Sequence, residues 1–197
     1  MYKACANQAD YTIDPKDRKA GKLQTAEDGE EIGVTMLHMY LIVVRFRCLE
    51  PTAQQAFQAQ LVNHFFYQAE AKMEDVHELT SRMIRQKYLK DVFVQWRGLI
   101  LAYDEGLVKG DAVLASAVWR NLFKAREDVD VRALAAVVSW IRAGISRMAE
   151  MEDGEVEVQA QRAFPLLINQ FGAVDLPTAS LKAAIEKATV AQATVRS

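Results

Sequence analysis

The sequence predicts an all-α fold: a single helical domain of about five principal helices, with an irregular N-terminal arm and a C-terminal helical extension. Apolar residues recur with a period of about 3.6 over several long stretches, which is typical of amphipathic helices. Alternating apolar and polar residues never continue long enough to build a sheet. We place the irregular arm at residues 1–33, the helical domain at 34–152 and the extension at 153–197.

Composition limits the classes of protein to which the chain can belong. The 197 residues are 51% hydrophobic and 25% charged, as in ordinary globular proteins, and the formal net charge of −2 gives no whole-chain preference for nucleic acid. Cys5 and Cys48 do not form a Cys/His spacing, which argues against structural zinc and a disulfide framework. The longest apolar run, around 39–44, is far shorter than the roughly 20 residues that cross a bilayer.

The first expected helix spans residues 35–48, with Thr35 as its N-cap. Nearly every side chain after Thr35 is apolar, so this helix is either deep in the core or docked on another molecule. His38 is the polar break before Arg45. A single histidine in such a setting is more often a hydrogen-bonded core residue than a ligand.

The second expected helix spans residues 51–73 and begins at Pro51, a residue that suits a first helical turn. Its inner stripe has a spacing of four residues: Phe57, Leu61, Phe65 and Ala69. Residues 64–67 are all aromatic in type, and neighbouring positions on a helix point about 100° apart. They cannot all face one core, so we expect a second apolar surface here.

The third expected helix, residues 81–107, has an apolar stripe and a basic beginning. The stripe consists of Leu89, Phe93, Trp96, Ile100 and Tyr103. Val94 and Leu101 point away from it, so we expect the helix to be covered on two sides and to lie at the centre of the domain. The basic residues at its beginning are Arg82, Arg85, Lys87 and Lys90. We expect them to form a solvated face; the alternative is that they contact ribosomal RNA or an anionic membrane surface.

The remaining helices follow turn signals along the chain. Gly110 and Asp111 predict a turn followed by an N-cap aspartate, and helices are expected over 111–124 and 131–151. A further helical segment over 156–164 is interrupted by Pro165, and Pro177 opens a last helix.

Catalytic and metal-binding patterns are sparse. The three histidines do not form a pair at a spacing of four, and Glu74 and His77 make one Glu-x-x-His fragment, whereas a helical di-iron site needs two. We therefore predict no catalytic residue, metal ligand or cofactor. Asp104 and Glu105 are expected to pair with Arg97 or Arg120 beside core tryptophans, with an interface hot spot around Trp96 and Trp119 as the alternative.

Several stretches resemble one known family: LHMYLIVVRFR, LVNHFFYQAEAKM and KYLKDVFVQWRGLILAYDEGLVKGDAVLASAVWRNLF, with the helix that follows. They resemble the ubiquinol–cytochrome c chaperones, assembly factors of respiratory complex III, and are most similar to the fungal mitochondrial members. The resemblance covers about residues 36–150, and the stretch from Lys87 to Phe123 is its most specific part. Residues beyond about 153 fall outside it.

The resemblance implies a non-enzymatic protein on the matrix side of the inner mitochondrial membrane. Such a protein would pair with a small helical assembly factor, act near the mitoribosomal tunnel exit, and receive newly made cytochrome b as its client. It would work as a hetero-oligomer, and peripheral contact with the membrane stays open. We therefore expect partner or client binding at Met36, Met39, Tyr40, His64, Phe66 and Tyr67. We expect ribosome or RNA contact at Arg82, Arg85, Lys87 and Lys90.

Two other functions compete with a chaperone. A helical haem- or lipid-handling protein, or an enzyme, would use His38 or His64 with the aromatic residues nearby. An RNA-binding module would use the basic residues between 82 and 90, and its binding would weaken as salt is raised.

Overall fold

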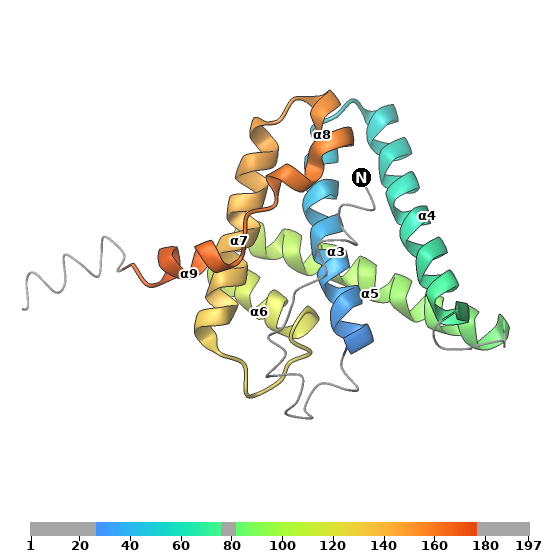
Figure 1. Ribbon diagram of the computed structural model, residues 1–197, viewed down its shortest axis with the longest axis horizontal. Coiled ribbons are helices and arrows are strands. Elements are labelled where there is room, and N and C mark those ends of the chain that lie inside the picture. The colour runs from blue at the N-terminus through green and yellow to red at the C-terminus, as the bar shows by residue number, and fades with distance from the viewer. Residues whose placement is uncertain (1–26, 76–81, 177–197) are drawn as a thin grey trace, which may run out of the picture.

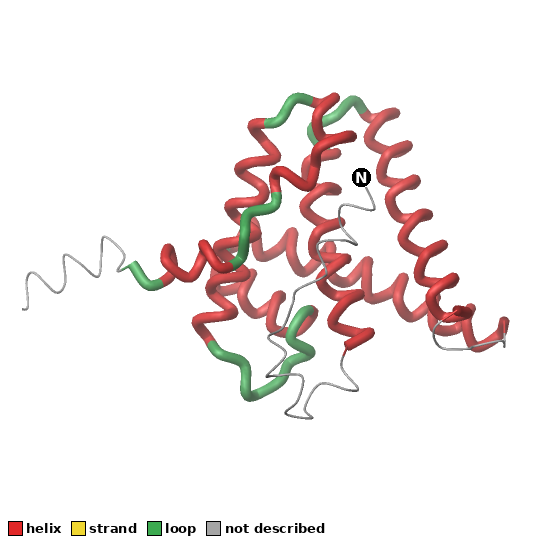
Figure 2. Tube along the Cα trace, viewed as in Figure 1, coloured by secondary structure: helices red, strands yellow, loops and turns green. Residues whose placement is uncertain are grey.

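A computed structural model describes residues 27–75 and 82–176, and all regular structure in these ranges is helical, which confirms the all-α prediction. Figures 1 and 2 show one bundle of crossing helices. The elements, in chain order, are α3 (Glu27–Phe46), α4 (Pro51–Asp75), α5 (Arg82–Lys109), α6 (Asp111–Asn121), α7 (Val131–Glu150), α8 (Asp153–Gln159), the 3₁₀ turn η1 (Ala160–Ala163) and α9 (Ile168–Val174).

Helix α3 is the centre of the bundle. It lies between α4 and α7, and α5 crosses it (Figure 1). Its apolar run is buried on every side, because Met39, Leu41 and Ile42 are each 0% exposed. This stretch has no polar face because other helices of the same chain cover it on all sides.

Helix α5 was expected at the centre, and this prediction is wrong. Val94 and Leu101, the residues that suggested a second covered side, are 62% and 71% exposed. One side of α5 is buried, through Val92, Trp96, Leu99, Tyr103 and Gly106. Phe93, placed on the inner stripe by spacing, is 44% exposed at the edge of this buried side.

Helices α5 and α6 form a tight hairpin whose turn depends on two glycines. Gly110 has φ +110° and is the N-cap of α6, so Asp111 is the first helical residue and not the N-cap that we predicted. Asp111 instead forms an ion pair with Arg142 at 2.9 Å. A Cβ on Gly106 would lie 2.5 Å from the Cα of Leu114, so only glycine permits this approach of the two helices.

Several other helix boundaries differ from those predicted. Helix α3 starts at Glu27, and Thr35 is a buried residue within it and not a cap. Helix α6 ends at Asn121, before Lys124 and Ala125, which have positive φ values. The segment expected to be helical over 156–164 is α8 followed by η1, and the helix expected after Pro177 lies outside the described residues.

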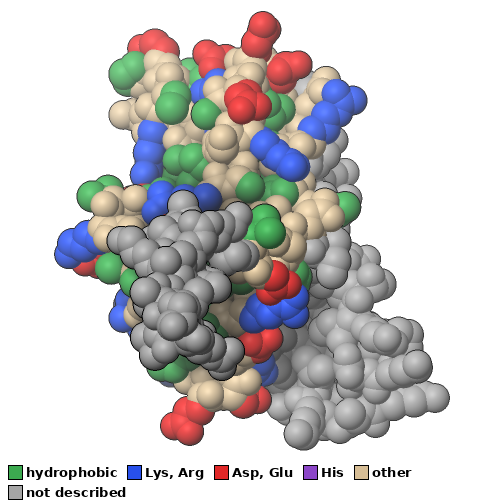
Figure 3. All heavy atoms as spheres, turned by 90° about the vertical axis from the view of Figure 1, so that its left-hand side faces the viewer, with side chains coloured by type: hydrophobic (Ala, Val, Ile, Leu, Met, Phe, Trp, Pro, Cys, Tyr) green, Lys and Arg blue, Asp and Glu red, His purple; other side chains and the backbone are tan. Residues whose placement is uncertain are grey.

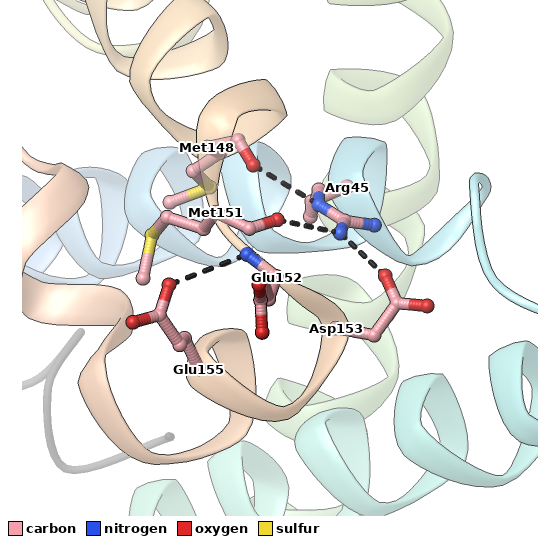
Figure 4. A network of polar contacts seen from close by, with 6 residues as sticks. All are labelled: Arg45, Met148, Met151, Glu152, Asp153 and Glu155. Carbon is pink, nitrogen blue, oxygen red and sulfur yellow. Dashed lines mark hydrogen bonds and ion pairs between the residues drawn. The ribbon is translucent and has the colours of Figure 1, made fainter.

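Arg45 joins the end of α3 to the junction between α7 and α8 (Figure 4). Its Nε donates to the carbonyl of Met148 at 3.0 Å, and its Nη2 donates to the carbonyl of Met151 at 3.0 Å and to Asp153 Oδ1 at 2.5 Å. The side chain is only 8% exposed. Helix α8 then begins with a capping box between Glu152 and Glu155, so a cluster of charged residues determines where α7 stops.

Candidate partner-binding surface

Exposed large hydrophobic side chains gather on α4 and α5. Eight of the eleven such residues in the described ranges belong to these two helices, and seven of the eight belong to α5. They are Tyr67, Met83, Ile84, Tyr88, Phe93, Val94, Leu101 and Val108. They do not form one patch, because Phe93 lines the groove toward α4 whereas Val94 and Leu101 point away from the buried side of α5. Each of these apolar areas is a candidate interaction site.

The face formed by α7, α8 and α9 is different. Figure 3 shows acidic, basic and apolar side chains interspersed over it, with acidic groups near its upper edge, where α7 meets α8. The acidic residues at that junction are exposed: Glu150, Glu152, Asp153 and Glu155.

An open groove of about 560 Å³ runs between α4 and α5. Its apolar part includes Val62, Trp96 and Ile100, and Arg97 is its charged residue. The remaining lining residues are Gln55, Gln58, Ala59 and Phe93. Apolar surface with amide and guanidinium groups beside it can bury an apolar side chain of another protein while hydrogen bonding to its backbone.

The structure brings one of the predicted aromatic residues of α4 to this groove. The Phe66 ring packs on Phe65 at 5.1 Å and on Phe93 at 5.8 Å, centroid to centroid. Tyr67 is 73% exposed and His64 is also exposed, but both point away from the groove side of the helix. The second apolar surface expected on this helix therefore consists of Phe66 beside the groove, and Tyr67 separate from it.

Met36, Met39 and Tyr40 lie inside the core, where they are 2%, 0% and 0% exposed. In this structure they form no part of the surface. The Tyr40 hydroxyl donates to Asp104 at 2.9 Å, and burial together with this hydrogen bond and the charge of Asp104 raises the pKa of Tyr40 well above its usual range. The cause is general, since a buried phenolate next to a carboxylate is unfavourable.

Asp104 is bound by Arg47, a residue just after α3 that the sequence analysis did not connect with it. Arg47 donates to its two carboxylate oxygens at 2.7 and 2.9 Å, and this bidentate pair raises the pKa of Arg47. The predicted partners were Arg97 and Arg120, whereas Asp104 accepts hydrogen bonds from Arg47 and Tyr40. Glu105 bonds to Lys109 at 2.6 Å. Asp104 therefore links α5 to α3 and the turn that follows it, whereas Glu105 pairs within α5.

The basic beginning of α5 is divided between two environments. Arg82, Lys87 and Lys90 are exposed. The side chain of Arg85 is only 12% exposed and lies 3.8 Å from Glu70 on α4. Lys87 and Lys90 point about 60° apart on the outer side of the helix, so they can contact one anionic surface together.

The two histidines considered as ligands lie in unrelated places. His38 is buried, and its Nδ1 donates to the carbonyl of Val34 at 2.8 Å. Its ring meets Trp140 and Phe164 edge to face at centroid distances of 4.8 and 4.6 Å. Burial among these apolar rings lowers the pKa of His38 to about 4. His64 is exposed on α4, so the two side chains share no site.

Among the residues that the structure describes, no group of three or more His, Cys, Asp or Glu side chains could hold a metal ion. His77, part of the Glu-x-x-His fragment, lies outside them. None of the helices in residues 27–75 and 82–176 is sufficiently long and apolar to cross a membrane.

Comparison with known protein families gives one match that covers most of the described domain. The model of the ubiquinol-cytochrome C chaperone family matches residues 29–163, from the first turn of α3 to the end of η1. This chain belongs to the ubiquinol–cytochrome c chaperone family. The match confirms the family expected from the sequence and extends beyond residues 36–150 at both ends, so α8 and η1 of this chain are part of the family domain.

Curated relatives come from fungi and vertebrates. The chain is 36% identical over 122 residues to the mitochondrial protein CBP3 of Saccharomyces cerevisiae, a match covering 62% of this chain and 36% of the yeast protein. It is 25% identical over 155 residues to ubiquinol-cytochrome-c reductase complex assembly factor 1 of Xenopus laevis, covering 79% of this chain and 73% of the frog protein. The human protein of that name matches at 25% identity, covering 70% of this chain and 44% of its own length. The chain thus spans about a third of the yeast relative, and no solved structure matches it.

Proposed function

We propose that this chain is a mitochondrial assembly factor for respiratory complex III that works by binding proteins and not by catalysis. The observation that carries the proposal is the family match over residues 29–163. Relatives in yeast and frog are named for mitochondria and for assembly of ubiquinol-cytochrome-c reductase, respectively. A non-catalytic role is supported by the described residues, where buried polar groups serve the scaffold and exposed apolar groups gather on α4 and α5.

The proposal extends to partners and location. The chaperone binds newly made cytochrome b and supports its synthesis at the mitoribosomal tunnel exit, on the matrix side of the inner membrane, in a hetero-oligomer with a small helical partner. The α4–α5 groove offers an apolar site for a client or partner, with Phe66 and Phe93 at one end. The exposed Arg82, Lys87 and Lys90 offer positive charge to ribosomal RNA or to lipid phosphates.

Affinity purification from mitochondria tests this function. The tagged chain, extracted under mild conditions, should bring down a small helical protein and mitoribosomes, and cells without the chain should lose complex III and newly made cytochrome b. Recovery of neither partner from mitochondria that contain both, together with normal complex III in cells lacking the chain, would contradict the proposal.

A haem-handling role has less support from the geometry. His38 uses Nδ1 in a hydrogen bond and its ring is enclosed by Trp140 and Phe164, while His64 stands alone on an exposed helix face. We expect no Soret shift when haem is added to the purified chain, and the same spectra for His38→Ala and His64→Ala. A shift that disappears in either variant would restore the haem hypothesis.

A further inference from the structure

The outer side of α5 carries a regular stripe that the bundle leaves uncovered. Val94, Leu101 and Val108 are spaced by seven residues and are 62%, 71% and 88% exposed. Met83, 81% exposed, lies on the same line eleven residues before Val94. The stripe is opposite the buried side of the helix, where Trp96 and Leu99 contact the core.

The spacing of this stripe keeps it on one narrow line along α5. Residues seven positions apart differ by only about 20° around a helix, so Val94, Leu101 and Val108 can all face one helix laid along α5. A helix that lies on a membrane presents a broad apolar face instead, because it must cover acyl chains over much of its circumference. The stripe on α5 is narrow, since exposed Lys90 and Arg97 alternate with its apolar members.

Gly98 is a second, independent observation on the same side. It lies in the interior of a 28-residue helix, and a Cβ built there would meet nothing within 4 Å. Glycine in a helix interior is unfavourable relative to alanine, so a fold that needs no space at this point has no internal reason to retain it. At helix–helix contacts, a glycine allows the partner backbone to approach closely.

Charge along the stripe selects the kind of partner. Three exposed basic residues, Lys87, Lys90 and Arg97, stand against one exposed acidic residue, Asp91, in its N-terminal two-thirds. Glu105 is bonded to Lys109. A second copy of this chain would bring basic residues against basic residues in a parallel pairing. A partner helix with glutamate or aspartate beside its apolar seam would complement them.

We propose that the outer stripe of α5 (Met83, Lys87, Lys90, Val94, Arg97, Gly98, Leu101 and Val108) is the docking site for an acidic amphipathic helix of another protein. This inference rests on the proposed function, because it assigns a surface to the small helical partner of the assembly factor. The partner helix lies along α5 with its apolar seam on Val94 and Leu101, approaches the backbone at Gly98, and places carboxylates against Lys90 and Arg97.

Direct binding to a synthetic peptide tests the chemistry of the site. The probe is a fluorescently labelled amphipathic helix of about four heptads, with leucine at the seam and glutamate on both flanks. Its binding to the full chain is measured by anisotropy at low and high salt. We expect binding that weakens with salt, and binding at least about tenfold weaker for a probe of the same seam with lysine flanks.

Two substitutions with matched controls locate the contact. Gly98→Leu fills the space for the partner backbone, and Leu101→Glu removes seam area and adds repulsion; each should weaken binding by about tenfold or more. The controls are Gly172→Leu on α9, where a Cβ likewise meets nothing within 4 Å, and Val131→Glu at the start of α7, where valine is 77% exposed. Both controls should bind as the unaltered chain does.

The outcomes separate the alternatives. Equal binding of acidic and basic probes, or equal binding of Gly98→Leu and Gly172→Leu, would overturn the proposal. So would capture of the chain by vesicles of phosphatidylcholine and cardiolipin that Leu101→Glu abolishes, since the stripe would then be a membrane contact. In cells that lack the protein, full restoration of complex III by the Gly98→Leu variant would refute this docking site alone. Normal complex III in cells that lack the protein altogether would refute the proposed function, but it would not affect the peptide-binding result.

Discussion

At the scale of single residues, polar side chains that are far apart in the sequence become linked at the C-terminal end of α3. Arg45 reaches from α3 to the last carbonyls of α7, and Arg47, two residues later, reaches to Asp104 on α5. A guanidinium is suited to both positions, because its several N–H groups can satisfy more than one acceptor while the aliphatic stem stays buried. These two arginines therefore set how α3 lies against α5 and α7.

Arg45→Met should destabilise the chain by about 2–3 kcal/mol. Methionine fills the space of the stem but leaves the carbonyls of Met148 and Met151 without their charged donor. Urea unfolding followed by circular dichroism gives the free energy of unfolding. Arg147→Met, at an exposed position on α7, is the control and should change that free energy by less than about 0.5 kcal/mol. Equal effects of the two variants would contradict the role assigned to Arg45.

His38 makes stability depend on pH. Its folded-state pKa of about 4 lies below the ordinary histidine pKa of 6.5, so the unfolded chain binds a proton more readily between these values. The stabilising effect of the neutral imidazole is therefore complete above about pH 6.5 and is lost as pH falls toward 4. A difference of this size corresponds to about 3 kcal/mol.

Unfolding free energies measured at pH 7.5 and at pH 4.5 check this prediction. His38→Asn retains a donor for the Val34 carbonyl but does not titrate, so the fall in stability between the two pH values should be smaller in the variant by most of that amount. A variant with the same pH dependence as the unaltered chain would show that other groups are responsible.

At the scale of elements, the two glycines on opposite sides of α5 have different surroundings. Gly106 faces α6 at a distance that excludes any side chain, whereas Gly98 faces open space. The first glycine is required by packing inside the bundle. The second is compatible with any small residue as far as the described fold is concerned, and this contrast is what directs attention to the outer side of the helix.

Alanine at these two glycines should shift stability in opposite directions. Gly106→Ala places a Cβ 2.5 Å from a backbone atom of Leu114 and should cost about 1–3 kcal/mol, because the helices must separate. Gly98→Ala meets no such atom and should stabilise the helix by up to about 1 kcal/mol. Thermal melts of the two variants beside the unaltered chain test the prediction, and a lower Tm for Gly98→Ala would contradict it.

At the scale of the whole molecule, the segment after α7 completes the core. Phe164 and Trp140 stack with centroids 6.1 Å apart, His38 lies against both rings, and the Trp140 indole N–H donates to the Pro165 carbonyl at 2.6 Å. The central helix is thus covered by residues that follow it by more than a hundred positions. The described part of the C-terminal extension is integrated into the domain and packs on α7.

Removing the Phe164 ring should therefore loosen the region around α3. Phe164→Ala is expected to cost about 3 kcal/mol and to move Trp140 fluorescence to longer wavelength as water reaches the indole. Leu166→Ala, where leucine is 67% exposed, serves as the control and should change stability by less than about 0.5 kcal/mol. An unchanged emission spectrum in Phe164→Ala would show that the C-terminal segment does not seal the core.

Periodicity alone was enough to establish the helical class, the order of the helices and the buried residues Leu61, Phe65, Trp96 and Tyr103, because these depend on which residues share a helix face. The motif stretches identified the family as well, since they are local in the chain. Burial of Met36, Met39 and Tyr40 was decided only by the tertiary structure, because an all-apolar helix can be covered by its own chain or by a partner. The same holds for the exposure of Val94 and Leu101 and for the α4–α5 groove: whether an apolar face is covered depends on how many neighbouring helices pack against it, which no single stretch of sequence encodes.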